Sequence, residues 1–557
     1  MRTLLNMARA KYIWAESDLT AFAATTSTPA VGFSGLRARL TSIPAIVSDA
    51  LFFLLVAVDI VRTLRHAMWR DELQSFMLAS ASSSIWDLFL NVKLEAHPGL
   101  WYMLVWLLTR VTSDPMWMQV MHIALAVGTW VIIYRWSPFG RAEKILILLS
   151  YFLFWEYFVI SRSYVLLALI GFAFVALRQY RPRQRVIPWL LLGLLANVHV
   201  FGAIWSMALG ASLALQNVRR NSAQLAGVAV YLALFGLAIA TMVPPRYYWL
   251  SRADVVYDSP RAPGAIRLEV SRFNQSLEVP LGAFVPLQLE SVRNTFVFLA
   301  DPGHATVPQF YNTNPLYGGY PVTDYPLWLA LLFAVPVAAC WLITRNWLRV
   351  LEFFLVYAGV ILFTNMWNYI GNARTDGVLF LALLASVWTA RARSAPPVWS
   401  SWLLVGLLVI NACAGVLTLA SELQPFSQAR NTAAWIKQNN LADAFLIGSG
   451  DAEVSSVTGY LGRPVYYLEC ECYGTFIIWN EKRQSPLSRE EFGRRLGRAV
   501  GLAEQRDAIL IRNRPVVPED LGSNASSLAV RLLKTLAGAT RPDESYWIYR
   551  VIKTPLP

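Results

Sequence analysis

The chain has 557 residues, of which 56% are hydrophobic and 15% are charged, and its formal net charge is +13. An average soluble chain is about 45–50% apolar and about 25% charged, so this composition excludes a disordered protein, a coiled coil and an ordinary cytosolic enzyme. The 22 Trp, 23 Tyr and 28 Phe suit a chain with many membrane–water boundaries. The sequence therefore predicts an α-helical polytopic membrane protein, whose positive charge faces anionic lipid rather than nucleic acid.

The first residues and the charge-free runs define the expected spans. Residues 1–44 carry scattered Arg and Lys before any long apolar run, which favours a cytoplasmic tail over a secretory signal. Since a membrane helix needs about 20 apolar residues, the runs within 45–421 predict about eleven or twelve passes. The region 187–216 either crosses once or folds as a hairpin near Asn197 and His199. The candidate spans are 45–61, 98–111, 116–134, 145–160, 164–179, 187–216, 221–245, 325–344, 353–373, 377–390 and 394–421.

Two polar regions interrupt this pattern. The first is a large loop at 244–324, rich in Pro, Gly, Asn and Tyr. The second is 422–557, where charge returns and short apolar runs alternate with helical patterns, as in a small soluble α/β domain. We expect strands at 444–448, 464–468, 508–511 and 545–549, and helices at 429–439, 489–504 and 525–537.

The basic loops predict an orientation. Loops 345–349 and 391–393 should be cytoplasmic, which puts the large loop and the 422–557 domain on the extracytoplasmic side. The basic loops 136–144 and 178–185 also favour the inside, which places 161–163 outside. Counting from a cytoplasmic N-terminus then disagrees by one pass around 98–134, and a short or broken helix there would reconcile the two.

The first extracytoplasmic loop, 62–97, carries the strongest functional pattern. Asp71 and Glu72 follow the first span, and Glu95 and His97 stand before the second. Ionisable residues at this depth are functional candidates, and a half-buried carboxylate can act as a general base. The alternative is a solvated helix N-terminus whose acidic pair complements the helix dipole.

This spacing resembles the GT-C class of integral-membrane glycosyltransferases, with protein O-mannosyltransferases and lipid A aminoarabinose transferases nearest in pattern. These families place a catalytic Asp in the first extracytoplasmic loop and a second acid shortly before Pro-Pro-Leu-Tyr-Tyr-like residues. Asp71 matches the first position and Glu95 the second, while Gly99 stands where the second Pro is usual. The resemblance covers roughly residues 45–180.

The resemblance implies a polyprenyl-phosphate sugar donor, which needs cationic partners near the interface. Arg162 and Tyr164 are similar to the Arg-x-Tyr segment of these families, and Arg374 is a second phosphate candidate. Arg162 could instead be a loop arginine at the lipid interface, and Arg374 could pair with Asp376.

Other residues are weaker candidates. His199 stands in a long charge-free run and either lines the cavity or packs. Glu156 lies close in sequence to Arg162, and pairing the two is the economical expectation. Cys470 and Cys472 lack a second Cys or His pair at zinc spacing, so no structural zinc site is expected. No cofactor is implied, and a divalent cation is an alternative that no residue cluster supports.

The resulting hypothesis is an inverting transfer of a sugar from a polyprenyl-phosphate donor to a lipid, glycan or protein acceptor at a bacterial inner membrane. Asp71 is the expected base, with Glu72 and Glu95 positioning the acceptor or tuning Asp71, and Arg162 or Arg374 helping the phosphate to leave. The rival is a transporter or flippase of a lipid-linked sugar, because intramembrane charges also suit a substrate path. A scaffold without catalysis is the third alternative.

Overall fold

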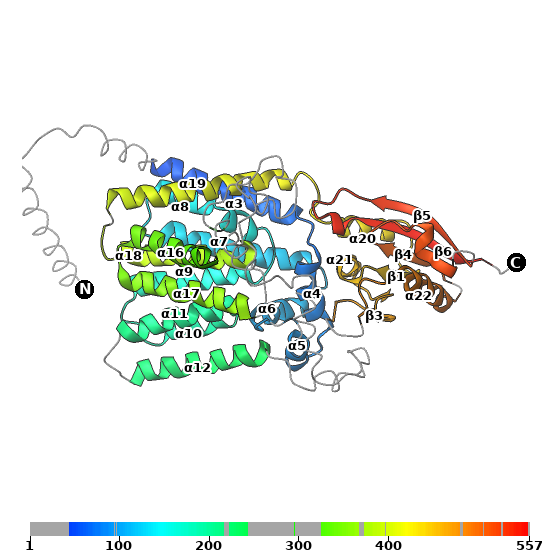
Figure 1. The fold of residues 1–557 in the computed structure, drawn as a ribbon, viewed down its shortest axis with the longest axis horizontal. Helices are drawn as coiled ribbons and strands as arrows, with labels where there is room; N and C mark the ends of the chain where they lie inside the picture. The colour runs from blue at the N-terminus through cyan, green and yellow to red at the C-terminus, as the bar shows by residue number, and fades with distance from the viewer. Residues whose placement is uncertain are drawn as a thin grey trace, which may run out of the picture.

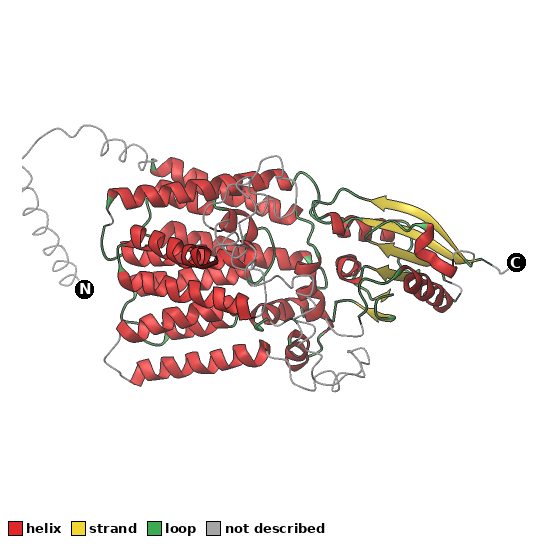
Figure 2. Ribbon diagram, viewed as in Figure 1, coloured by secondary structure: helices red, strands yellow, loops and turns green. Residues whose placement is uncertain are grey.

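The computed structural model describes residues 44–93, 95, 97–216, 222–242, 295, 325–366, 373–395, 397–478, 483–504, 506–524 and 527–554. The expected N-terminal tail and the large loop lie outside these residues, except for positions 44 and 295. The described chain forms a helical bundle followed by a domain that contains a β-sheet (Figures 1 and 2). This is the predicted fold class.

The bundle buries one continuous apolar core, rich in Trp, Phe, Tyr and Leu side chains. It also contains a single π-helical turn, η1 (Phe152–Glu156), between α8 and α9. Its helices are α3 (Ala45–Arg65), α4 (Arg70–Ala81), α5 (Ile85–Val92), α6 (Leu100–Thr109), α7 (Met116–Trp136), α8 (Arg141–Leu148), α9 (Tyr164–Tyr180), α10 (Ile187–Ala196), α11 (Val200–Gln216), α12 (Ser222–Met242), α16 (Tyr325–Thr344), α17 (Trp347–Met366), α18 (Ala373–Arg391) and α19 (Val398–Ser421).

Three helices among the described residues are long and apolar enough to cross a membrane on their own, namely α7, α12 and α19. Several other apolar helices are shorter, so the count of eleven or twelve passes stays a prediction. Helices α10 and α11 pack against each other on either side of a break at residues 197–199, so region 187–216 is a hairpin. Helix α6 has only ten residues. It is the short helix that would reconcile the basic loops with the order of passes.

The two ends of helix α18 show which residues lie at each end of the bundle. It begins beside Arg374 and ends at Arg391, whose Nη1 lies 2.7 Å from Glu143 Oε2 at the start of α8. Because an α-helix rises about 1.5 Å per residue, these arginines are roughly 25 Å apart. The C-terminal domain lies beside α4 (Figure 1), whose Asp71 pairs with Arg374 at the start of α18, so the domain is at the Arg374 end. The basic loops 136–144 and 391–393 meet at the opposite end.

The C-terminal domain is a six-stranded sheet of order β3-β2-β1-β4-β6-β5 between two layers of helix. Strands β1, β2 and β4 are parallel and buried, and the other pairs are antiparallel. One face packs on α22 and the other on α20 and α21. The elements are α20 (Ala429–Gln438), β1 (Phe445–Ser449), α21 (Asp451–Leu461), β2 (Val465–Tyr467), β3 (Cys472–Gly474), α22 (Arg489–Leu502), β4 (Ala508–Arg512), η6 (Pro518–Asn524), β5 (Leu528–Leu536), η7 (Pro542–Glu544) and β6 (Tyr546–Lys553).

Four expected strands and two expected helices of this domain are present, but the helix expected at 525–537 is wrong. Residues Leu528–Leu536 instead form the edge strand β5, which pairs antiparallel with β6 along its length. The Leu, Arg and Lys in this run favour a helix locally, and pairing with the neighbouring strand overrides that preference. Helix α21 was not expected from the pattern.

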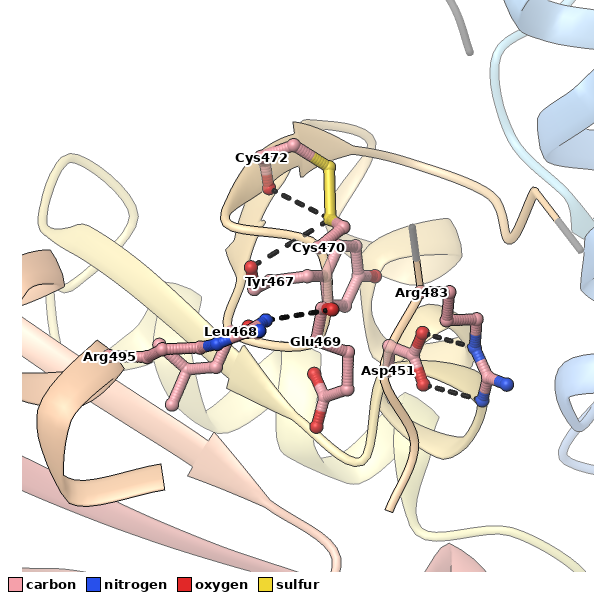
Figure 3. Close-up of a disulfide and its surroundings, with 8 residues drawn as sticks. All are labelled: Asp451, Tyr467, Leu468, Glu469, Cys470, Cys472, Arg483 and Arg495. Atoms are coloured by element: carbon pink, nitrogen blue, oxygen red, sulfur yellow. Dashed lines mark hydrogen bonds and ion pairs between the residues drawn. A yellow bond between two sulfur atoms is a disulfide. The ribbon is translucent and has the colours of Figure 1, made fainter. Parts of the chain in front are cut away.

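Cys470 and Cys472 form a disulfide at the turn between β2 and β3 (Figure 3). Beside it, Arg483 donates two hydrogen bonds to the carboxylate of Asp451, at 2.5 and 2.7 Å. Arg495 donates through Nη1 to the carbonyl oxygens of Leu468 and Glu469, so the polypeptide around the disulfide is held from two directions. The cysteines are therefore structural in this chain, and the expectation that they hold no zinc stays a prediction.

Two glycines of α19 provide a packing test. A Cβ at Gly415 would lie 1.9 Å from the Leu149 carbonyl oxygen, whereas a Cβ at Gly406 would meet nothing within 4 Å. Alanine at either position improves helix propensity by about 1 kcal/mol. We expect Gly415→Ala to lose about 1–3 kcal/mol through overpacking against backbone that cannot yield. Thermal unfolding in detergent, followed by tryptophan fluorescence, should show a lower midpoint for Gly415→Ala and no loss for Gly406→Ala. Equal midpoints would contradict this packing.

Candidate active site

Helix α4 presents the two acidic residues of the first loop. The helix begins at Arg70, with Asp71 and Glu72 in its first turn, where carboxylates complement the positive end of the helix dipole. Glu72 Oε2 also accepts a hydrogen bond from the Trp69 N–H at 3.3 Å, which satisfies a backbone donor that the helix leaves unpaired. Asp71 keeps 32% of its side chain exposed.

Asp71 is shared by two arginines from distant parts of the chain. Its Oδ2 lies 2.8 Å from Arg162 Nη1 and 3.2 Å from Arg374 Nη1. Partial burial alone would raise the pKa of Asp71, but the charges of Arg162 and Arg374 outweigh burial and lower this pKa below its usual value. The structure thus brings the expected base and both expected phosphate ligands into one cluster, which we call the Asp71 cluster.

Glu156 belongs to the same cluster, but not through the partner expected from sequence. Its Oε1 lies 2.5 Å from Arg374 Nε, and its Oε2 accepts from the Tyr151 hydroxyl at 2.7 Å. Arg162 instead pairs with Asp71, so the expectation of a Glu156–Arg162 pair is wrong. Glu156 is the last residue of the π-turn and is buried against Arg374, whereas Arg162 lies in the segment after the turn and reaches Asp71. The side chain of Asp376 is outside the described residues.

Glu72 is fully buried and holds the backbone of the site together. Its Oε2 lies 3.0 Å from His66 Nε2, and its Oε1 accepts from the Ser161 N–H at 2.6 Å. Ser161 directly precedes Arg162, so Glu72 fixes the segment that carries the arginine. The alternative of a solvated acidic pair is wrong for Glu72, since its side chain is inaccessible to solvent.

Aromatic and imidazole rings extend the cluster away from Asp71. The Arg162 guanidinium lies 5.9 Å from the Tyr164 ring, and the Tyr164 hydroxyl lies 3.3 Å from His199 Nε2. His199 Nδ1 accepts from the Phe201 N–H at 3.2 Å, so a neutral ring carries its proton on Nε2 and donates to Tyr164. The ring of His97 lies 4.8 Å from that of His199. Each of these four predicted binding residues is therefore in contact with the next, in the order Arg162, Tyr164, His199 and His97.

Glu95 is held by a residue that the sequence did not single out. Gln74, one turn beyond Asp71 on α4, donates from Nε2 to Glu95 Oε1 at 2.8 Å. Burial raises the pKa of Glu95 to about 7, and the Gln74 hydrogen bond and the charge of Arg162 oppose that rise. Nothing in the sequence pattern distinguishes Gln74 from a solvent-facing glutamine of an amphipathic helix.

The C-terminal domain adds charged groups on the other side of α4. Arg70 forms ion pairs with Glu453 of α21 and with Asp543, the latter at 3.0 Å. Arg541 stacks on the Trp69 ring at 4.4 Å, and Arg374 lies 5.3 Å from the same ring. These residues are far from the first loop in sequence, and no local pattern could have joined them to it.

A metal centre finds no support in this arrangement. Among the residues that the structure describes, no group of three or more His, Cys, Asp or Glu side chains could hold a metal ion. The charged side chains closest to Asp71 are arginines, which bind anions in a bidentate fashion and repel cations. The arrangement is suited to an anionic group such as a phosphate.

The fold and the site together define a helical membrane protein with an arginine-lined carboxylate between its bundle and an α/β domain. No protein-family model matches the chain, and no curated protein does. Among solved structures, the chain is similar to the crystal structure of ArnT from Cupriavidus metallidurans bound to undecaprenyl phosphate, with 13% sequence identity and a TM-score of 0.39. That match covers 91% of this chain and 97% of the other. At these values the case for function rests on the chain's own residues.

The raised pKa of Glu95 predicts a pH-dependent stability. Because the folded state binds this proton up to about pH 7 and the unfolded chain releases it near 4.5, Glu95 stabilises the fold fully below pH 4.5 and progressively less towards pH 7. Each unit of pKa corresponds to about 1.4 kcal/mol. Relative to Glu95→Gln, the wild type should therefore lose thermal stability between pH 5 and 7 and run parallel above pH 8. Melting curves that stay parallel throughout would contradict a raised pKa of Glu95 in the folded protein.

Proposed function

We propose that this protein is a GT-C-like glycosyltransferase, which moves a sugar from a polyprenyl-phosphate donor to an acceptor hydroxyl. The observation that carries the proposal is the pairing of one carboxylate, Asp71, with two arginines from separate parts of the chain, one in the segment before α9 and one at the start of α18. A carboxylate can take the proton of an acceptor, and two guanidinium groups can hold the phosphate that leaves. The sequence pattern of the first loop resembles that class independently.

The arginines explain how donor and base are coupled. Without a donor, Arg162 and Arg374 neutralise Asp71 and keep its pKa low, which makes it a weak base. When a donor phosphate accepts hydrogen bonds from these arginines, their positive charge stabilises the ionised form of Asp71 less. The carboxylate then becomes more basic at the moment when both substrates are present.

The proposed reaction is a single displacement. Asp71 removes the proton of the acceptor hydroxyl while the acceptor oxygen attacks the anomeric carbon. The bond from that carbon to the phosphate oxygen breaks, its electron pair stays on the phosphate, and the arginines bind the polyprenyl phosphate that is released. One displacement inverts the anomeric centre. The identities of the sugar and of the acceptor class are left open.

The remaining residues have supporting roles in this proposal. Glu72 is inaccessible and anchors the Arg162 segment through Ser161, so we assign it to positioning rather than to proton transfer. Glu95 lies within the electrostatic reach of Arg162 and Asp71 and can bind an acceptor hydroxyl. Contacts run from Arg162 through Tyr164 and His199 to His97, and we assign these residues to substrate binding.

An extracytoplasmic site, predicted from the loop charges, gains support from two features.

 The basic loops gather at the end of the bundle opposite to Arg374, and basic loops favour the cytoplasmic side. The C-terminal domain, at the Arg374 end, carries the disulfide between Cys470 and Cys472, and disulfides form in oxidising compartments. We therefore place the site and this domain outside a bacterial inner membrane.

Replacing the base tests the reaction. We expect Asp71→Asn to lower transfer from synthetic polyprenyl-phosphate sugars by about 100- to 10,000-fold, the range for loss of general base catalysis. Asp87→Asn is the matched control, since Asp87 is a half-buried acid in the first turn of α5 in the same loop and lies outside the Asp71 cluster. Release of polyprenyl phosphate is the readout. Transfer that survives Asp71→Asn would refute the assignment, and labelled lipid that crosses the bilayer without being consumed would favour a transporter.

Replacing an arginine tests the phosphate site. We expect Arg162→Ala to weaken binding of undecaprenyl phosphate by roughly 10- to 100-fold, because a hydrogen bond to a charged group contributes about 1.5–3 kcal/mol. Undecaprenol, which lacks the phosphate, should bind both proteins equally weakly. The matched control is Arg110→Ala, which removes an exposed arginine at the end of α6. Native mass spectrometry of the purified protein gives both affinities, and equal losses in the two variants would contradict a phosphate site at Arg162.

A further inference from the structure

The side chain of Gln74 joins three parts of the molecule. Its Nε2 donates to Glu95 Oε1 at 2.8 Å and to the Ile477 carbonyl oxygen at 2.7 Å. Its Oε1 accepts from the Ile477 N–H at 3.0 Å. Both protons and the oxygen of this buried amide are therefore used, one proton on the loop acid and the rest on the backbone of the C-terminal domain.

The position of Gln74 on α4 links it to the base. Residues three apart on a helix lie on neighbouring surface positions, so Gln74 stands beside Asp71. Glu95 reaches the same region from the loop before α6 and interacts electrostatically with both Asp71 and Arg162. The Tyr102 hydroxyl also hydrogen bonds Glu95. The Glu95 carboxyl is thus held between a side chain of α4 and a side chain of α6.

The partner of Gln74 is the backbone of a buried residue. Ile477 is 5% exposed and follows strand β3, which is paired with β2 in the sheet. Along the same helix, Leu73 and Met77 pack against Gly459 of α21, where an added Cβ would come within 3.3 Å of both. Arg70 pairs with Glu453 one turn earlier. The C-terminal domain therefore contacts α4 over two turns. Gln74 is the residue of α4 that bonds both this domain and Glu95.

We propose that Gln74 is a positioning residue, which uses the Ile477 backbone of the C-terminal domain to fix the Glu95 carboxyl beside Asp71. This inference rests on the proposed function for its effect on transfer, but not for its effect on Glu95. The C-terminal domain then contributes to the site, because its Ile477 backbone holds the Gln74 amide that bonds Glu95. Gln74 itself touches no reacting atom.

The test compares Gln74→Met with Asn91→Leu. Methionine keeps the length of the side chain and removes all three hydrogen bonds. Asn91 is a buried amide of α5 whose Nδ2 bonds Ser82 Oγ at 2.9 Å, so Asn91→Leu removes a buried amide hydrogen bond from the same loop without touching Glu95. The first readout is the titration of the Glu95 carboxyl, which is isolated as the infrared difference against Glu95→Gln in each background.

In Gln74→Met, the Glu95 titration should move upward by about one pH unit, since one hydrogen bond to the ionised form is lost. Transfer should fall by up to about 100-fold in kcat, with the KM for donor changing much less, as expected when a group near the reacting atoms is misplaced. The Asn91→Leu variant should leave both measurements unchanged. A lowered melting temperature with an unmoved Glu95 titration would overturn the proposal and make Gln74 merely structural.

The infrared measurement also separates this proposal from the proposed function. If the wild-type protein transfers no sugar, the function fails while a shifted Glu95 titration still supports the role of Gln74. If transfer occurs and neither the titration nor kcat responds to Gln74→Met, the role of Gln74 fails and the function stands.

Discussion

The structure depends on charge neutralisation around Asp71 at the boundary of the helical bundle. Two carboxylates, Asp71 and Glu156, are balanced by two arginines, Arg162 and Arg374, and the pairs span 91 to 303 positions of sequence. Removing one member would leave its partners partly buried without compensation, which costs more than the pair contributes. The first loop, the segment after the π-turn and the start of α18 are therefore fixed relative to one another. Under the proposed function, an arriving phosphate disturbs this balance, and uptake of the acceptor proton by Asp71 offsets the added negative charge.

The C-terminal domain completes the surroundings of that cluster rather than standing apart from it. Arg70 on the helix that carries Asp71 is paired with Glu453, and its backbone N–H donates to Glu544 at 3.1 Å. Glu544 is fully buried and also accepts from the hydroxyls of Ser427 and Ser456. The helix of the first loop is thus bound on one face to membrane helices and on the other to the sheet domain. Its two carboxylates consequently have different surroundings, since Asp71 is partly exposed and Glu72 is fully buried.

Much of the fold and part of the site follow from the sequence. Charge-free runs predict the apolar helices, and the spacing of Asp71, Glu95 and Arg162 predicts residues that meet in space. The partner of Glu156 was missed because proximity in sequence was taken for proximity in space, and the observed partner, Arg374, lies 218 positions away. Gln74 and Arg541 were missed because their roles come from docking of the C-terminal domain, which leaves no periodic trace. The β5 strand was missed because a neighbouring strand, not local propensity, decides its conformation.

The segment between α19 and α20 limits how the C-terminal domain could be exchanged between related chains. Within residues 422–428, Phe426 packs against the rings of Trp69 and His66, and Ser427 bonds Glu544 at 2.6 Å. Connections between domains usually tolerate changes of length because few contacts cross them. Here the connection is itself part of the interface, so its length and sequence are constrained. A chimera that exchanges the soluble domain would have to carry this segment and helix α4 with it as one module.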